Sequence, residues 1–135
     1  MKNPLVFIIL VNFNGEADTI ECVQSLNALT YDNYRIIIVD NGSATPISEE
    51  GKAFLHRHAQ LICHDKNEGF AGGNNIGIRS AMKQQADMVL LLNNDTTVEP
   101  DFLNVLVGQY QKHPESLLFR KYTVSDNCKM RSGVY

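Results

Sequence analysis

Short apolar runs alternate along the chain with longer amphipathic segments. Four apolar runs predict strands, at Leu5–Val11, Tyr34–Asp40, Leu61–His64 and Met88–Asn93. Four stretches with apolar residues at helical spacing predict helices: Glu16–Leu29, a helix from about Pro46, Asn74–Gln85 and Asp101–Lys112. Strands that alternate with helices favour right-handed crossovers. We therefore predict an α/β fold, a Rossmann-like and mainly parallel sheet with helices on both faces.

The same pattern predicts several local details. Thr45 suits the N-cap of the second helix, since Pro46 suits a first helical turn. The apolar run that precedes Asp95 is predicted to be buried on both faces, as strands of helix-covered parallel sheets are. The last helix is predicted to turn four apolar side chains inward: Phe102, Leu103, Val105 and Leu106.

The pattern decays after Pro114. The segment Ser116–Tyr135 has one apolar cluster, Leu117–Phe119, and then a polar tail without helical or strand periodicity. We predict one folded unit over residues 1–113 and an irregular tail over residues 114–135. A docking arm, a disordered end and a truncation boundary all remain open for this tail.

Composition narrows the functional classes. The 135 residues are enough for one domain with a hydrophobic core. A net charge of -3 with mixed signs argues against nucleic acid as a partner. The longest apolar run is too short to cross a bilayer. The three cysteines, Cys22, Cys63 and Cys128, lack metal-ligand spacing and predict reduced thiols in the cytoplasm.

Two carboxylates lie at or just after the ends of predicted strands. Asp40 ends the apolar run of the second strand, and Asp95 follows the fourth. Because the carboxyl ends of parallel strands meet at one edge, both should lie on one rim, where open α/β sheets bind ligands. Asp40 could accept hydrogen bonds from a pyrimidine imide or a ribose hydroxyl. It could equally close an Asx-turn with Gly42, and the two roles are compatible.

Asn93-Asn94-Asp95 carries the clearest metal chemistry in the sequence. A lone carboxylate beside amide oxygens suits a hard divalent cation that keeps waters and takes its other ligands from phosphates. The alternative is a turn before a helix, with Asp95 or Thr97 as the cap. The four histidines lack metal-ligand spacing and are predicted to be surface residues.

Two further segments are rich in amides or glycines. Val11–Gly15 could bring a loop close to a base or a sugar, or could simply cap the following helix with an Asn. Asn67–Gly77 leads into a predicted helix, where backbone amides and the helix dipole favour a phosphate. It matches neither a Walker loop nor the G-x-G-x-x-G spacing, so taken alone it is a weak signal.

Four strings together resemble the amino-terminal half of family-2 glycosyltransferases with the GT-A fold, especially their rhamnosyltransferase-like branch. They occur in the family's order over about residues 4–113. The matching strings are Ile9–Asn14, Ile38–Ser43, Asn67–Gly77 and Leu91–Thr96.

The resemblance implies inverting transfer of a sugar from a nucleotide diphosphate donor to a hydroxyl acceptor. Asp40 would read the base, and Asp95 would hold Mg or Mn on the diphosphate as the last residue of the family's D-x-D motif. Asn93 replaces the first acid of that motif. The other implied substrate-binding residues are Val11, Asn12 and Asn14 near the nucleoside, Asn67, Gly69, Gly73 and Asn74 near the ribose and diphosphate, and Asn94.

The resemblance also implies an acceptor-binding half that supplies the general base, and no residue here matches that base. We therefore expect weak nucleotide binding, little or no transfer, and self-association through surfaces that the other half would cover. A saccharide or lipid-linked acceptor in polysaccharide or cell-envelope synthesis, at the cytoplasmic membrane face, would fit the family. The alternatives are a non-catalytic nucleotide-binding or interaction module and, less well supported, a nucleotidylyltransferase-like protein.

Overall fold

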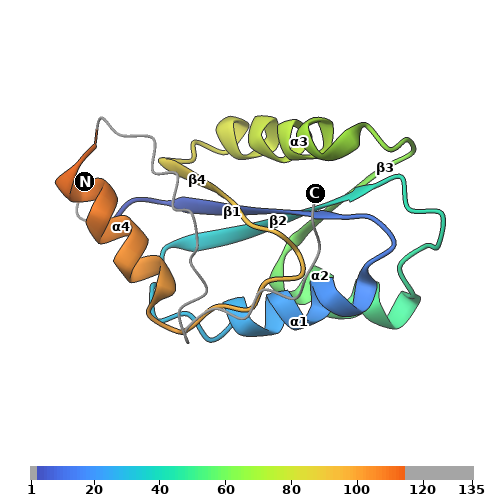
Figure 1. The fold of residues 1–135 in the computed structure, drawn as a ribbon, viewed down its shortest axis with the longest axis horizontal. Coiled ribbons are helices and arrows are strands. Elements are labelled where there is room, and N and C mark those ends of the chain that lie inside the picture. Colours follow the sequence, from blue (N-terminus) through green and yellow to red (C-terminus); the bar gives the residue numbers. More distant parts are fainter. Residues whose placement is uncertain (1–2, 115–135) are drawn as a thin grey trace.

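The computed structural model describes residues 3–114, which form a parallel sheet with helices on both faces (Figure 1). The strands pair in the order β3-β2-β1-β4, and every pairing is parallel. The predicted α/β class is therefore confirmed. The elements in chain order are β1 (Val6–Asn12), α1 (Glu16–Leu26), β2 (Tyr34–Asn41), α2 (Glu49–His58), β3 (Gln60–His64), α3 (Gly69–Lys83), β4 (Met88–Leu91) and α4 (Phe102–Lys112).

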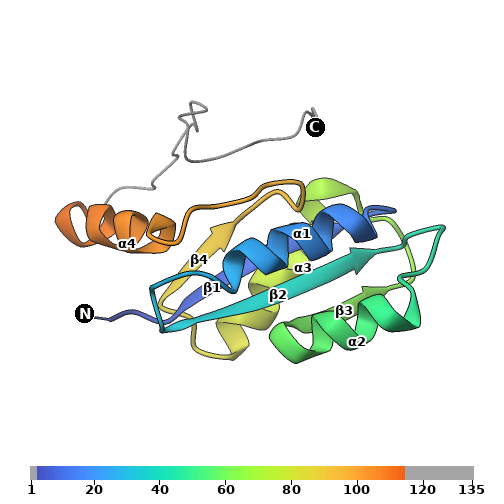
Figure 2. The same cartoon turned by 90° about the horizontal axis from the view of Figure 1, so that it is seen from below.

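Two apolar layers hold the sheet, because successive side chains of a strand point to opposite faces. Val6, Ile8 and Leu10 of β1 point into the larger layer, which includes buried residues of α1, α2 and α4. Phe7 and Ile9 point into a smaller layer under α3. Seen from below, α1 and α2 cross in front of the sheet and α3 lies behind it (Figure 2).

Helix α3 approaches the sheet closely because glycines face it. A Cβ on Gly77 would lie 2.4 Å from Cγ2 of Ile9, and one on Gly73 would lie 2.9 Å from Cγ1 of Val11. Both distances are shorter than real Cβ contacts allow. The two glycines are four residues apart and so lie on one face of the helix. They form a groove that accepts the side chains of β1.

Two helices begin at positions that differ from the prediction. Helix α2 begins at Glu49, and its N-cap is Ser48 rather than Thr45, because the Ser48 hydroxyl accepts a hydrogen bond from the Gly51 amide at 3.0 Å. Helix α3 begins at Gly69, five residues before the predicted Asn74. Low helix propensity hid its first turns, where Gly69, Gly72 and Gly73 stand among few strong helix formers.

Helix α1 is shorter than predicted. It ends at Leu26, and the chain then tightens into a turn in which Ala28 and Leu29 donate to carbonyls three residues back, at 3.2 and 3.1 Å. The prediction over Glu16–Leu29 therefore included this turn. An apolar residue in such a turn continues the helical spacing without continuing the helix.

Two predictions of burial were wrong. Val89 and Leu91 of β4 are 37% and 46% exposed, because β4 is an edge strand of the described sheet and α3 covers mainly β1 and β2. In α4 the inward residues are Phe102, Leu103, Leu106 and Val107, and Val105 is 39% exposed. These four buried residues lie on one face of α4 at helical spacing, and Val105 lies on the other face.

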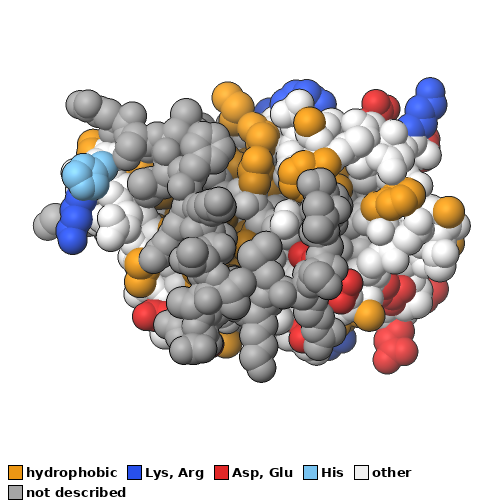
Figure 3. All heavy atoms as spheres, in the orientation of Figure 1, with side chains coloured by type: hydrophobic (Ala, Val, Ile, Leu, Met, Phe, Trp, Pro, Cys, Tyr) orange, Lys and Arg blue, Asp and Glu red, His pale blue; other side chains and the backbone are white. Residues whose placement is uncertain are grey.

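Large hydrophobic side chains are exposed on both α3 and β4 (Figure 3). Among residues 3–114 no helix combines the length and the apolar character needed to cross a membrane. The predicted tail lies outside the described residues from residue 115 onward.

Candidate functional site

The carboxyl ends of β1 and β2 bring two predicted site residues together. Asn12 pairs in register with Asp40, and its amide Nδ2 donates to Oδ1 of Asp40 at 3.0 Å. The Ser43 hydroxyl donates to the same oxygen and accepts from the Asn14 amide at 2.9 Å. Asp40 itself is partly exposed. No described residue hydrogen-bonds its other oxygen, Oδ2.

A buried chain of hydrogen bonds continues from Asn12 away from Asp40. The Thr19 hydroxyl of α1 donates to Oδ1 of Asn12 at 2.7 Å, and Nδ2 of Asn94 donates to the Thr19 oxygen at 3.0 Å. Thr19, Asn12 and Asn94 are all buried, with exposures of 0%, 1% and 6%. This series of hydrogen bonds therefore connects the segment after β4 to the end of β2 through α1 and β1.

Asp95 lies in a turn just beyond β4, on the same rim. The turn is closed by a hydrogen bond from the Thr96 amide to the Asn93 carbonyl at 3.2 Å. Oδ1 of Asp95 is buried and has no hydrogen-bond partner among residues 3–114. A buried acceptor without a partner is costly and calls for an explanation such as a bound ion.

The chemistry around Asp95 restricts which metal site is conceivable. The described residues hold no cluster of three or more His, Cys, Asp or Glu side chains that could surround an ion. One carboxylate with neighbouring amides therefore suits a hard cation such as Mg or Mn, with ligands from water and phosphate. A structural zinc site, which needs about four protein ligands, does not fit this turn.

The segment that precedes α3 is held by amides at the end of β2. Buried Asn41 donates from Nδ2 to the Gly69 carbonyl at 2.9 Å and accepts the Glu68 amide at 3.1 Å. Oδ1 of Asn67 accepts the Gly69 amide at 2.8 Å. These bonds pin the amino terminus of α3 beside the rim. Gly42 turns here with φ +70°, close to the backbone of Lys66.

The remaining predicted site residues occupy different environments. Val11 and Gly73 contact each other in the packing of α3 on β1. Asn74 is 4% exposed and donates to the Phe70 carbonyl within α3 at 3.1 Å. Asn14 is exposed, and its Oδ1 accepts the Thr45 amide at 3.0 Å. Of these four, Asn14 is the one whose side chain is exposed at the rim.

Sequence reasoning missed three residues of the site: Thr19, Ser43 and Asn41. Ser43 could have been found, because Asp and Ser side chains within one turn commonly form local hydrogen bonds. Asn41 belongs to the same string, but its type alone does not distinguish it from the other amides. Thr19 carried no signal, since a Thr inside an amphipathic helix has no motif.

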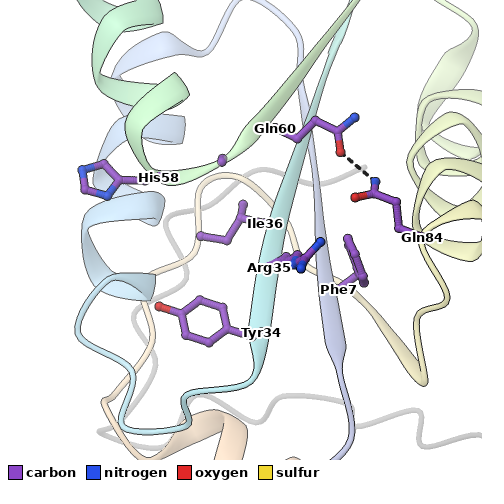
Figure 4. A pocket seen from close by; sticks show the side chains of 8 residues that line it. Phe7, Tyr34, Arg35, Ile36, His58, Gln60 and Gln84 are labelled. Atoms are coloured by element: carbon purple, nitrogen blue, oxygen red, sulfur yellow. Dashed lines mark hydrogen bonds between the residues drawn. The ribbon is translucent and has the colours of Figure 1, made fainter.

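A cavity of about 320 Å³ lies at the opposite, amino edge of the sheet (Figure 4). Gln84, the C-cap of α3, donates to Gln60 there at 2.8 Å, and the Arg35 guanidinium lies 6.0 Å from the centre of the Phe7 ring. None of the predicted site residues lines this cavity. Its lining is Phe7, Tyr34, Arg35, Ile36, His58, Ala59, Gln60 and Gln84.

The parallel sheet and its flanking helices have the GT-A fold, and comparison with known proteins gives the family. The model of the family described as "Glycosyl transferase family 2" matches residues 7–131, so this chain belongs to that family. The match continues past residue 113, where the resemblance of the four strings ends. The family assignment made from those strings is thus confirmed.

Individual relatives agree with this assignment. EpsH of Bacillus subtilis (strain 168), which is named as a glycosyltransferase, is 32% identical over 104 residues, which are 76% of this chain and 29% of EpsH. The dTDP-rhamnosyl transferase RfbF of Shigella flexneri is 28% identical over 108 residues, 77% of this chain and 34% of RfbF. The chain thus spans about a third of the length of these relatives.

Solved structures confirm the GT-A fold. The mannosyltransferase PcManGT from Pyrobaculum calidifontis, in complex with GDP-Man and Mn2+, matches with a TM-score of 0.68 at 18% identity, over 80% of this chain and 32% of its own. S. aureus TarS 1-349 in complex with UDP-GlcNAc matches with a TM-score of 0.66 at 16% identity, over 81% of this chain and 32% of its own.

Proposed function

We propose that this chain forms the donor-binding half of a glycosyltransferase and binds a nucleoside diphosphate sugar at the carboxyl rim of its sheet. The observation that carries the proposal is the buried Oδ1 of Asp95, which has no partner within the described part of the chain and lies on the rim that also presents Asp40. One carboxylate serves the diphosphate through a cation, and the other serves the nucleoside. The named ligands of the matched mannosyltransferase and of TarS support a donor of this chemical class.

Asp95 is the residue that would hold Mg or Mn. The ion would supply charge neutralisation at the departing diphosphate. The turn over Asn93–Thr96 keeps the carboxylate at the strand end, and the cation would satisfy the oxygen that residues 3–114 leave without a partner. Asn93, in the place of the first acid of D-x-D, contributes no charge. A net -1 from the protein leaves the cation able to bind the diphosphate strongly.

Asp40 would accept a hydrogen bond from the base or from a ribose hydroxyl. Two donors already hold Oδ1, so the carboxylate is oriented before a ligand arrives, and Oδ2 remains for recognition. A hydrogen bond to a charged group of this kind is worth ~1.5 to 3 kcal/mol. Asn67 and Gly69 would lie beside the ribose and diphosphate, at the pinned start of α3.

We further propose inverting transfer to a hydroxyl acceptor in polysaccharide or cell-envelope synthesis. Asp40 and Asp95 have roles toward the donor, so we assign activation of the acceptor to an acid outside residues 3–114. General base help of this kind contributes ~100- to 10,000-fold to a rate. The transfer activity of residues 3–114 alone is therefore expected to be low.

Calorimetric titration of UDP, dTDP and GDP, each with Mn and then with EDTA, tests the donor site. We expect weak binding of at least one nucleotide that Mn strengthens, and loss of the Mn effect in Asp95→Ala. Asp101→Ala removes an exposed acid that makes no capping hydrogen bond before α4, so it is the matched control. An Asp95→Ala protein that keeps the full Mn effect would refute the metal assignment. Absence of any binding would favour a non-catalytic interaction module.

A further inference from the structure

The hydrogen bonds behind Asp40 all run in one direction. Asn94 donates to Thr19, Thr19 donates to Asn12, and Asn12 donates to Asp40. The distances are 3.0, 2.7 and 3.0 Å. Each donor therefore directs the positive end of its dipole toward the carboxylate. Hydrogen bonds in such a chain polarise one another and strengthen the last one.

Chemistry allows only this direction. An ionised carboxylate accepts but cannot donate, so Asn12 must present its NH₂ group to Asp40 and its carbonyl oxygen to Thr19. The Thr19 hydroxyl must then give its single proton to Asn12, and its lone pairs accept from Asn94. The hydroxyl is suited to this position because it donates and accepts through one atom.

Without the hydroxyl, Asn12 loses one of the two partners that fix its orientation, and only the contact with Asp40 remains. The two ends of an amide have nearly the same shape, and Asn12 is 1% exposed, so water cannot take over the role of Thr19 easily. A rotated amide would present its oxygen to Asp40. Two acceptors would then face each other, and the carboxylate would move or lose its orientation.

We propose that Thr19 is a positioning residue of the nucleotide site, which sets the Asn12 amide and through it orients Asp40 toward the base or the ribose. This inference rests on the proposed function of Asp40. Thr19 touches no ligand in this scheme, because it is fully buried beneath the rim.

A double-mutant cycle separates this role from a general loss of stability. The nucleotide that binds best among UDP, dTDP and GDP is titrated in EDTA, which removes the metal contribution. We expect Asp40→Asn to bind about 10- to 100-fold more weakly and Thr19→Val about five- to tenfold more weakly than the wild type. Adding Thr19→Val to Asp40→Asn should change the affinity less than about twofold, because no carboxylate then remains to be oriented.

Three further variants act as controls. Thr19→Ser keeps the hydroxyl and should bind within about twofold of the wild type. Tyr34→Phe also removes one half-buried hydroxyl, which donates to the Leu26 carbonyl at 2.8 Å. Because Tyr34 lies at the amino end of β2, far from the rim, this variant should leave nucleotide binding unchanged. If Thr19→Val does not fold by circular dichroism, Thr19→Cys replaces it, since a thiol has a similar size but donates weakly.

The outcomes distinguish the two proposals. If Asp40→Asn binds as the wild type does, the role of Asp40 fails, and the role of Thr19 fails with it. If Asp40→Asn weakens binding while folded Thr19→Val, or Thr19→Cys in its place, does not, only the proposal for Thr19 is overturned. Equal losses from Thr19→Val with and without the Asp40 carboxylate would overturn it as well, because they indicate a purely structural effect.

Discussion

Replacement of Gly77 by Ala tests the close packing of α3 on the sheet. The new Cβ would lie 2.4 Å from Cγ2 of Ile9, whereas carbon atoms pack at about 3.5 to 4.0 Å. The helix and the strand must therefore separate by about 1 Å at this point. Ile9 is fully buried in the centre of β1, so it has no free space to move into.

The magnitude follows from two opposing terms. Overpacking a core costs ~1 to 3 kcal/mol, and a clash this short belongs at the upper end. Ala in place of Gly in a helix returns ~1 kcal/mol. We expect Gly77→Ala to lower the free energy of unfolding by ~1 to 2 kcal/mol. Gly108→Ala in α4 is the matched control, because a Cβ there meets nothing within 4 Å and should stabilise the protein by ~0.5 to 1 kcal/mol.

Urea denaturation followed by circular dichroism measures both variants, and an unchanged m-value shows that stability alone has changed. Combining Gly77→Ala with Ile9→Ala sharpens the test. Ile9→Ala alone should cost ~2 to 5 kcal/mol through its cavity, and the added methyl of Gly77→Ala should then have little cost or even stabilise. The reasoning is refuted if Gly77→Ala stabilises the protein as much as Gly108→Ala does.

Three other predictions concern single sites. Hydrogen bonds from Ser48 lower the pKa of Glu16 below 4.5, so Glu16 stabilises the fold above that pH and the stabilisation is lost as the pH falls through the lowered pKa. Glu16→Gln should therefore cost ~0.5 kcal/mol at pH 7, and urea curves should show that this difference disappears in acid. Gly42→Ala should destabilise by ~1 to 3 kcal/mol in the same assay, because φ is +70° and a Cβ would lie 2.4 Å from a backbone nitrogen; equal stability would contradict the described turn. Iodoacetamide followed by peptide mapping should label exposed Cys63 in the folded protein and buried Cys22 only after unfolding, and rapid labelling of Cys22 would contradict its burial.

The sequence was sufficient for the order of the elements and for the rim. Uninterrupted apolar runs identify β1 and β2, and a carboxylate or amide at the end of such a run must lie at the carboxyl edge of a parallel sheet. The positions of Asp40 and Asp95 on one edge therefore follow from the sequence alone. Their assigned roles toward base and metal remain predictions.

Other features depend on tertiary context that a local pattern does not contain. The glycines before Asn74 indicated a loop, yet Gly73 belongs to a helix and, together with Gly77 one turn later, lets that helix approach β1. The exposure of Val89 depends on which strand lies at the side of the sheet. The contacts of Thr19 with Asn12 and Asn94 exist only because the fold brings these three residues together. Propensity and periodicity describe neighbours in sequence, whereas these features join residues far apart along the chain.

The rim is supported mainly by uncharged groups, and this has a consequence for ionic strength. Asn12, Thr19, Asn41 and Asn94 are buried and hold their partners through hydrogen bonds, which salt screens very little. Added salt should therefore leave the geometry of the rim unchanged while it weakens the attraction between the exposed part of Asp95 and the proposed cation. The salt dependence of nucleotide binding would then report the charges of the ligand and its ion, with little contribution from the supporting protein.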